Sequence, residues 1–428
     1  MNFRTFIFRL YKAEILKVTF WNMLAVAVKM LTGLVSVKVV AVIIGPAGVA
    51  LLGQLSNFST MLMTASTGGI TNGVTKYIAE YKNDRNIIAA FLKTSLKIVF
   101  IFSCLSGILL IAGASFWSST IFHTKEYSFV FVLFGVTITL YALNSLLLAI
   151  INGFKEFRKY VTVNISGSIV GLIFSVVLVL FWKIEGALVA AVTSQSVVCI
   201  ITICLIYKSS WFDKKLFLGK IDKKTVGKLL HYSLMAIVTA TTVPVSQLII
   251  RSFIINDLSL NDAGLWEGIN RISNMYLMVI TTSLGIYYLP KLSESKTQAS
   301  LRHEIFKVYK LFIPILLFIS LSIFIFRDFI VEILFSSEFY GMKDLFMFQI
   351  IGDFFKISSW LLAYLMIAKS QTKLFVSTEI IFPLFSVLLS IPFIDIFGIR
   401  GATIVYAVKY FIYLVTMVII YRKIIFNK

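Results

Sequence analysis

Twelve apolar segments, each long enough to form a membrane-spanning helix, follow one another along the 428-residue chain. A helix needs about 20 apolar residues to cross a bilayer. Hydrophobic residues make up 59% of the chain and charged residues 14%, against about 45–50% and 25% in soluble domains. The sequence therefore predicts an all-α polytopic membrane protein and excludes a soluble or disordered chain. The predicted spans are 19–44, 50–79, 91–117, 128–153, 160–182, 186–207, 229–254, 264–289, 308–326, 344–368, 374–397 and 401–421.

Lysine and arginine are unevenly distributed between the segments that flank and join these spans. Counted together with the basic residues near the span ends, alternate segments, starting with the N-terminus, hold 29 of these residues, and the others hold 6. Basic residues concentrate on the cytoplasmic side of a membrane protein, so both termini are predicted to be cytoplasmic. The predicted parts are a basic amphipathic lead-in or frayed first span (1–18), a six-helix lobe (19–207), a basic cytoplasmic linker (208–228), a second six-helix lobe (229–421) and a short tail (422–428).

The two halves of the chain resemble each other at an offset of 211–216 residues. Gly45-Pro46-Ala47-Gly48 matches Asn261-Asp262-Ala263-Gly264, and Gly186-Ala187 matches Gly401-Ala402. Phe174-Ser175-Val176 also recurs as Phe385-Ser386-Val387. Because six spans is an even number, the two halves have the same orientation, and their pseudo-two-fold axis is predicted along the membrane normal. Secondary transporters with two such lobes hold their substrate between them.

Polar side chains fall on single faces of several predicted spans, at the 3.6-residue period of a helix. These faces are predicted to line a hydrated cavity, although stripes of serine and threonine also occur where helices pack together. The uncharged candidates for substrate contact are Asn57, Thr64, Asn270 and Asn274.

Ionisable residues inside the spans point more strongly to function, because a charge in the hydrocarbon core is costly and usually faces water or a partner. Basic side chains (Lys29, Lys38, Arg271, Lys356 and Lys409) outnumber Asp353 and Glu379, so a net positive cavity and an anionic cargo are predicted. The basic candidates for substrate binding are Lys29, Arg271, Lys356, Lys409 and Lys76. The candidates for binding a coupling ion are Asp353, Glu379 and Glu267.

Several of these residues have a structural alternative. Asp353 and Lys356 have the spacing of an ion pair on one helix face, and Glu379 has Lys409 as a possible partner. Lys76 is either an anchor at the cytoplasmic end or a substrate contact. Arg251 is interpreted as an anchor at the outer rim, and Glu267 is expected to be solvated.

Motifs of enzymes are missing from the sequence. The three histidines are not clustered, the three cysteines lack metal-ligand spacing, and no phosphate-binding loop is present. No cofactor and no catalytic residue are therefore predicted, and an ion gradient is the expected energy source.

A set of short motifs, in order along nearly the whole chain, is similar to the Wzx-type flippases of bacterial surface polysaccharide assembly, in the MOP (MATE-like) superfamily. The resemblance is strongest to the flippases for enterobacterial common antigen lipid III and for O-antigen. The motifs are Val28-Lys29 with Lys38, Gly45-Pro46-Ala47-Gly48, Asn72-Gly73-Val74-Thr75-Lys76-Tyr77, Leu265-Trp266-Glu267-Gly268, Tyr288-Leu289-Pro290, Arg327-Asp328-Phe329, Asp344-Leu345-Phe346, Gly352-Asp353 with Lys356, and Ile367-Ala368-Lys369.

The resemblance implies a MATE-like, V-shaped fold and transfer of an undecaprenyl-pyrophosphate-linked oligosaccharide to the periplasmic leaflet of the bacterial inner membrane. It also implies two six-helix lobes and a cationic cavity. Our hypothesis for the mechanism is alternating access driven by H+ or Na+, and a polysaccharide polymerase and a chain-length regulator are expected as protein partners. Two rival functions are a cation or drug antiporter of the same fold and a non-transporting scaffold of the assembly machinery. The excess of intramembrane basic residues favours the flippase over the antiporter, since cationic drugs require the opposite charge.

Overall fold

The computed structural model describes the backbone of residues 3–81, 84–207, 209, 211–212, 222–295 and 297–426, and the side chains of the same residues except 3–20, 22, 231–232, 235 and 286. The predicted lead-in at 1–18 thus has no described side chains, and most of the predicted linker lies outside the description. The elements, including π-helix η2 and 3-10 helix η3, are α1 (Phe3–Ser66), α2 (Thr71–Tyr81), α3 (Arg85–Ala112), α4 (Ala114–Phe122), α5 (Ser128–Gly153), α6 (Phe157–Ile206), α7 (Lys223–Asp257), α8 (Leu260–Ser283), η2 (Leu284–Tyr288), α9 (Leu289–Glu294), α10 (Gln298–Ile325), α11 (Arg327–Leu334), η3 (Ser337–Leu345), α12 (Phe346–Ala368), α13 (Thr372–Phe397), α14 (Ile399–Ile420) and α15 (Arg422–Phe426).

The prediction of an all-helical membrane protein is confirmed. Within the described residues, nine helices are long and apolar enough to cross a membrane. Two of these helices cover more than one predicted span: α1 covers the first span and the start of the second, joined at the non-helical Gly45, and α6 covers the fifth and sixth, joined at the non-helical Lys183. The predicted eighth span corresponds to α8, which is not one of these nine helices because its sequence is more polar than theirs. The helices are therefore consistent with the twelve predicted spans.

The predicted second span, 50–79, is not one continuous helix. Its helix ends at Ser66, and a turn at residues 67–70 precedes α2. Gly68 and Gly69 both have positive φ, 62° and 65°, a conformation that costs glycine little and other residues more. Hydropathy does not reveal this turn, because the segment is apolar on both sides of it. The predicted polar face of this span, which includes Asn57 and Thr64, consequently ends with α1 at Ser66.

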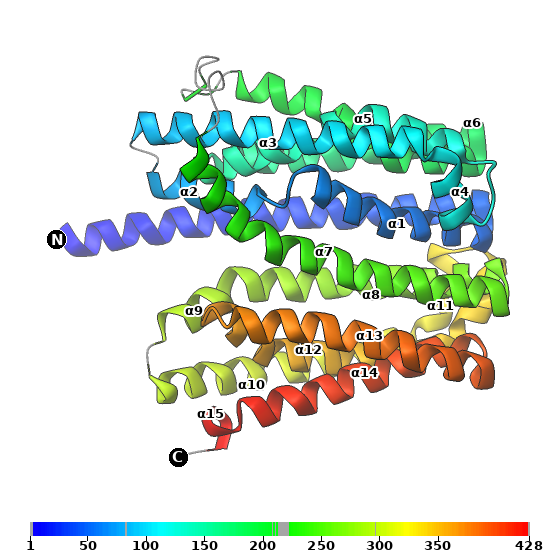
Figure 1. The fold of residues 1–428 in the computed structure, drawn as a ribbon. Coiled ribbons are helices and arrows are strands. Elements are labelled where there is room, and N and C mark those ends of the chain that lie inside the picture. Colours follow the sequence, from blue (N-terminus) through cyan, green and yellow to red (C-terminus); the bar gives the residue numbers. More distant parts are fainter. Residues whose placement is uncertain are drawn as a thin grey trace. The chain divides into compact units, whose positions relative to one another are not determined.

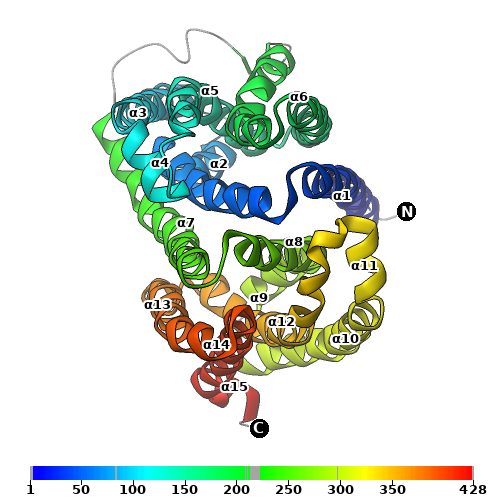
Figure 2. The ribbon, with the colours of Figure 1, turned by 90° about the vertical axis from the view of Figure 1, so that its right-hand side faces the viewer.

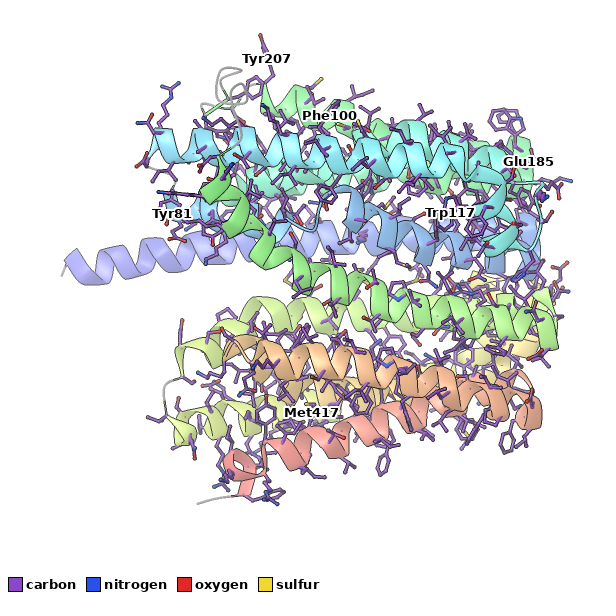
Figure 3. The ribbon with its side chains drawn as sticks, in the orientation of Figure 1. Tyr81, Phe100, Trp117, Glu185, Tyr207 and Met417 are labelled. Atoms are coloured by element: carbon purple, nitrogen blue, oxygen red, sulfur yellow. The ribbon has the colours of Figure 1, made fainter. Side chains whose placement is uncertain are left out.

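The outward faces of the long helices are apolar, as expected of helices in contact with lipid. On α3, Phe100, Ile108 and Leu109 are at least 60% exposed, and Phe318 on α10 is 73% exposed. Figure 3 labels the side chain of Phe100 on α3. Soluble proteins rarely expose such continuous apolar surface, so the exposure supports a membrane location for these helices.

The chain divides into two compact units, and the helices of each unit run alongside one another in Figure 1, as the end-on view in Figure 2 confirms. The first unit comprises Met1–Val39 and Ser59–Ile237, and the second comprises Val40–Phe58 and Val238–Lys428. The middle of α1 therefore packs with the C-terminal half of the chain, which differs from the predicted lobe of 19–207. In the second unit, Met417, labelled in Figure 3, is fully buried in a core with Leu361 and Tyr288.

Two glycines, one in each half of the chain, lie unusually close to the backbone of an earlier residue. Their offset along the sequence matches that of the internal duplication. A Cβ atom built on Gly186 would lie 1.9 Å from the carbonyl oxygen of Leu178, and one on Gly401 would lie 2.1 Å from that of Phe393. Each glycine follows its contact by eight residues, and the two glycines are 215 residues apart. Only glycine permits this close approach, so these repeated positions are explained by packing.

Candidate functional site

A buried carboxylate joins three helices of the second unit. Asp353 of α12 is 1% exposed, and its Oδ2 accepts hydrogen bonds from Ser273 Oγ of α8 at 2.6 Å and from the hydroxyl of Tyr276. Its Oδ1 accepts a bond from the Tyr406 hydroxyl of α14 at 2.7 Å. Charge-assisted bonds of this kind are stronger than neutral ones, so the carboxylate positions α8, α12 and α14 against each other.

Two lysines lie beside this carboxylate, on α12 and α14. Lys356 Nζ is 5.8 Å from the ring centroid of Tyr406 and 5.5 Å from that of Tyr410. Lys409 Nζ is 4.4 Å from the Tyr410 centroid and 5.4 Å from that of Tyr406. The faces of aromatic rings attract cations, and here the two tyrosines hold two ammonium groups close together.

Neither lysine forms an ion pair with a described carboxylate. Asp353 and Lys356 attract each other but form no contact ion pair, because hydroxyl groups occupy the Asp353 oxygens instead. Glu379 of α13 is half-buried and forms no ion pair with Lys409. This part of the second unit therefore holds two ammonium groups that form no contact ion pair with the carboxylates of Asp353 and Glu379.

A second ionic cluster joins α1, α7 and α8 within the second unit. Arg251 Nη2 donates to Glu267 Oε2 at 2.5 Å, and Nη1 donates to Gln54 Oε1 at 3.2 Å. Arg271 Nε donates to the other Glu267 oxygen at 3.1 Å. Gln54 Nε2 also donates to Ser252 Oγ at 3.2 Å. The Glu267 carboxylate is therefore held between two guanidinium groups.

This cluster corrects two predictions. Arg251 is not a rim anchor, since its side chain is only 1% exposed, and its guanidinium lies 5.3 Å from the centroid of Trp266. Glu267 is not freely solvated, because both of its oxygens bind arginine. Arg271, which is 22% exposed, pairs with Glu267 at the i, i+4 spacing on α8.

The other predicted site residues are scattered over several helices. Asn270 is buried and donates to the Trp266 carbonyl, and Thr64 donates to the Thr60 carbonyl. Asn57 is half-buried, and its Nδ2 donates no hydrogen bond to the described residues. The exposed members of the predicted set are Lys29, Lys76 and Asn274. Lys29, Thr64 and Lys76 belong to the first unit and the rest to the second, so a cavity shared by all of them stays a prediction.

Sequence reasoning missed the tyrosines of α14 and the polar partners of the buried charges. Tyr406, Lys409 and Tyr410 have i, i+3 and i+4 spacing, so their common helix face was visible as a signal. Ser273 was hidden among ordinary helix residues. Gln54 was not identifiable, because it bonds Arg251 across 197 positions of sequence.

The fold of this chain is that of the multidrug and toxin extrusion transporters. A MATE family multidrug transporter of the MOP superfamily in an inward-facing conformation has a TM-score of 0.77 and 14% identity, covering 92% of this chain and 94% of that one. An outward-facing structure of such a transporter has a TM-score of 0.61 and 14% identity, covering 93% and 94%. These identities are low, so the likeness establishes the fold.

Sequence comparison places the chain more narrowly. Two relatives, the "Lipid III flippase" of Escherichia coli (strain K12) and that of Shigella flexneri, are each 29% identical over 399 residues, which is 93% of this chain and 95% of each relative. Residues 15–296 match the family described as "Polysaccharide biosynthesis protein". The chain belongs to this family. Its relatives are flippases, in agreement with the prediction that the chain is not an enzyme.

Proposed function

We propose that this protein transfers an undecaprenyl-pyrophosphate-linked oligosaccharide from the cytoplasmic to the periplasmic leaflet of a bacterial inner membrane. The two flippase relatives support the proposal because they match 93% of this chain. The cargo belongs to the class used as O-antigen or enterobacterial common antigen repeat units. Both termini are cytoplasmic in this proposal, as the distribution of basic residues predicts.

One observation carries the proposal: among the described residues, no carboxylate oxygen lies within 4.0 Å of either ammonium group of the lysine pair on α12 and α14. A lysine in the hydrocarbon core costs roughly 2.5–3.5 kcal/mol on insertion scales, so two of them require a compensating role. A pyrophosphate carries the matching negative charge, and the rings of Trp360 and Tyr410 supply apolar faces for sugars. Lys356 Nζ lies 5.2 Å from the Trp360 centroid.

In this mechanism the polyprenyl tail stays in lipid while the headgroup crosses by alternating access between the lobes predicted at 19–207 and 229–421, with residues 40–58 moving as part of the second. Arg271 and Lys29 are further contacts for the anionic headgroup, and Asn57, Thr64, Asn270 and Asn274 are contacts for the glycan. Lys76 receives the headgroup at the cytoplasmic end. A polysaccharide polymerase and a chain-length regulator take over the product in the periplasm.

An H+ or Na+ gradient resets the transporter through Asp353 or Glu379. Asp353 is suited to this role because hydroxyl groups surround it and no ion pair fixes its charge. Gln349 Oε1, on the same helix, is buried and receives no hydrogen bond from the described residues. Carboxylate, hydroxyl and amide oxygens are the ligands that hard cations prefer. Glu267 is not retained as a coupling residue, because two arginines already occupy its oxygens.

The proposal is tested by transfer in proteoliposomes that contain a fluorescent lipid-linked oligosaccharide. Lys356→Gln/Lys409→Gln protein should transfer at least tenfold more slowly than the wild type. The matched control is Lys125→Gln, because Lys125 is exposed between α4 and α5. Unchanged transfer in the double variant contradicts the mechanism. Export of cationic dyes without lipid transfer identifies a drug antiporter, and no transfer of either identifies a scaffold.

A further inference from the structure

Three aromatic rings of the first unit surround one lysine, far along the chain from the site described above. Tyr77 and Tyr81 lie on α2 and Phe91 lies on α3. The Tyr77 ring stacks on Phe91 with centroids 4.9 Å apart and planes 20° apart. Tyr81 is nearly parallel to both, at 6.4 Å from Tyr77 and 6.1 Å from Phe91. Lys228 Nζ of α7 is 5.7, 5.3 and 5.9 Å from the centroids of Tyr77, Tyr81 and Phe91.

The start of α7 is fixed against α3, which holds Lys228 over the rings. Asp222 caps α7 by accepting hydrogen bonds from the backbone N–H and hydroxyl of Thr225, at 3.1 and 2.6 Å. The Asp222 N–H donates to Thr94 Oγ1 of α3 at 3.2 Å. Leu229, next to Lys228, is fully buried in the core that also contains Phe91. Lys228 itself is exposed.

The charge of Lys228 is positioned but not neutralised. No described carboxylate forms an ion pair with it. Lys76 Nζ lies 4.9 Å from the same Tyr77 ring, so two ammonium groups share one aromatic platform. Figure 3 places Tyr81 and Tyr207 at one end of the first unit and Glu185 at the opposite end. Tyrosine rings at helix ends are typical of the headgroup layer of a membrane, where basic side chains meet lipid phosphates.

We propose that Lys228, Lys76 and the rings of Tyr77, Tyr81 and Phe91 form a binding site for the phosphate group of a lipid headgroup. The rings keep the Lys228 ammonium in place, so its attraction for the anion costs less side-chain entropy than that of a free lysine. This inference rests on the proposed function, because the polyprenyl pyrophosphate cargo carries such a group. A phospholipid is the second source of the same chemistry. With the cargo bound, the site holds the headgroup at the cytoplasmic ends of α2 and α7 before transfer.

The test measures equilibrium binding to full-length, detergent-solubilised protein by microscale thermophoresis. Undecaprenyl pyrophosphate is the ligand in one arm, phosphatidylglycerol in the second, and phosphate-free undecaprenol in the third. All proteins carry Lys356→Gln/Lys409→Gln, so that the proposed central site does not contribute. In this background Lys228→Gln should raise Kd about fivefold, the factor given by roughly 1 kcal/mol per lysine near an anionic surface, and undecaprenol binding should not change.

Tyr77 provides a second variant that separates the rings from the charge. Tyr77→Leu should weaken binding of the phosphate lipids, whereas Tyr77→Phe should retain it, because only the former removes a ring face. A change confined to phosphatidylglycerol assigns the site to phospholipid, and a change confined to undecaprenyl pyrophosphate assigns it to the cargo. Unchanged Kd values for both lipids in Lys228→Gln protein, with an unaltered unfolding midpoint, overturn the inference. Transfer by the wild-type protein would then still support the proposed function.

Discussion

The arginine–glutamate cluster of α7 and α8 gives the sharpest test of the packing, because its members differ in exposure. Removing Glu267 leaves Arg251, which is 1% exposed, without a counter-charge. Removing one partner of a buried pair costs about 3–5 kcal/mol, so this is the expected loss of stability for Glu267→Gln. Arg271 is 22% exposed, and a helix pair of this kind contributes only about 0.3–0.5 kcal/mol.

The expected order of destabilisation is therefore Glu267→Gln, then Arg251→Gln, then Arg271→Gln. Arg251→Gln ranks second because Glu267 retains Arg271 as a partner. The assay is thermal unfolding of the purified protein in a lipid-containing detergent, with Arg251→Gln/Glu267→Gln completing a double-mutant cycle. The double variant should lose less than the sum of the single losses, since the two residues interact directly. Additive losses, or Glu267→Gln stability equal to that of Arg271→Gln, would refute the reasoning.

Two further predictions concern helix packing and capping. Gly401→Val should abolish accumulation of folded protein, because its Cβ would overlap the Phe393 carbonyl, and size-exclusion chromatography measures this. Gly171→Ala, where a Cβ meets nothing within 4 Å, should raise the unfolding midpoint slightly, and thermal unfolding measures this. The hydrogen bond from Thr225 lowers the pKa of Asp222 below its ordinary value, so the cap stabilises α7 above the unfolded-state pKa of about 3.9 and is lost as the pH falls through the lower folded-state pKa. Asp222→Ala should therefore speed hydrogen exchange at the start of α7 at pH 7. Equal exchange rates in the variant and the wild type at this pH would contradict the cap.

Much of the fold was predictable because lipid imposes a simple length and composition on each span. Hydropathy identified the helices even where Gly45 and Lys183 join two of them. It failed at Gly68 and Gly69, because an average over an apolar window does not register two residues that permit a turn. The middle of α1 was also assigned to the N-terminal half, because sequence order does not reveal that residues 40–58 pack with the second unit.

The candidate site was predictable in its charges but not in its contacts. Lys356 and Lys409 were identified as candidates because a charge in an apolar span is energetically costly and usually faces water or a partner. Helical periodicity gives the face of a residue without identifying the neighbouring helix. It therefore suggested Lys356 as the partner of Asp353, whereas Tyr406 donates to Asp353 across 53 positions of sequence. Arg251 was misplaced for the same reason, since Gln54 and Glu267 come from other helices.

Selectivity for the headgroup charge is the most direct test of a cationic binding site in a lipid-linked sugar transporter. Transfer in proteoliposomes is measured for one oligosaccharide attached either to undecaprenyl pyrophosphate or to uncharged undecaprenol. The lysine pair predicts rapid transfer of the charged lipid only, and loss of that preference in Lys356→Gln/Lys409→Gln protein. Equal transfer of both lipids by the wild type would contradict the account.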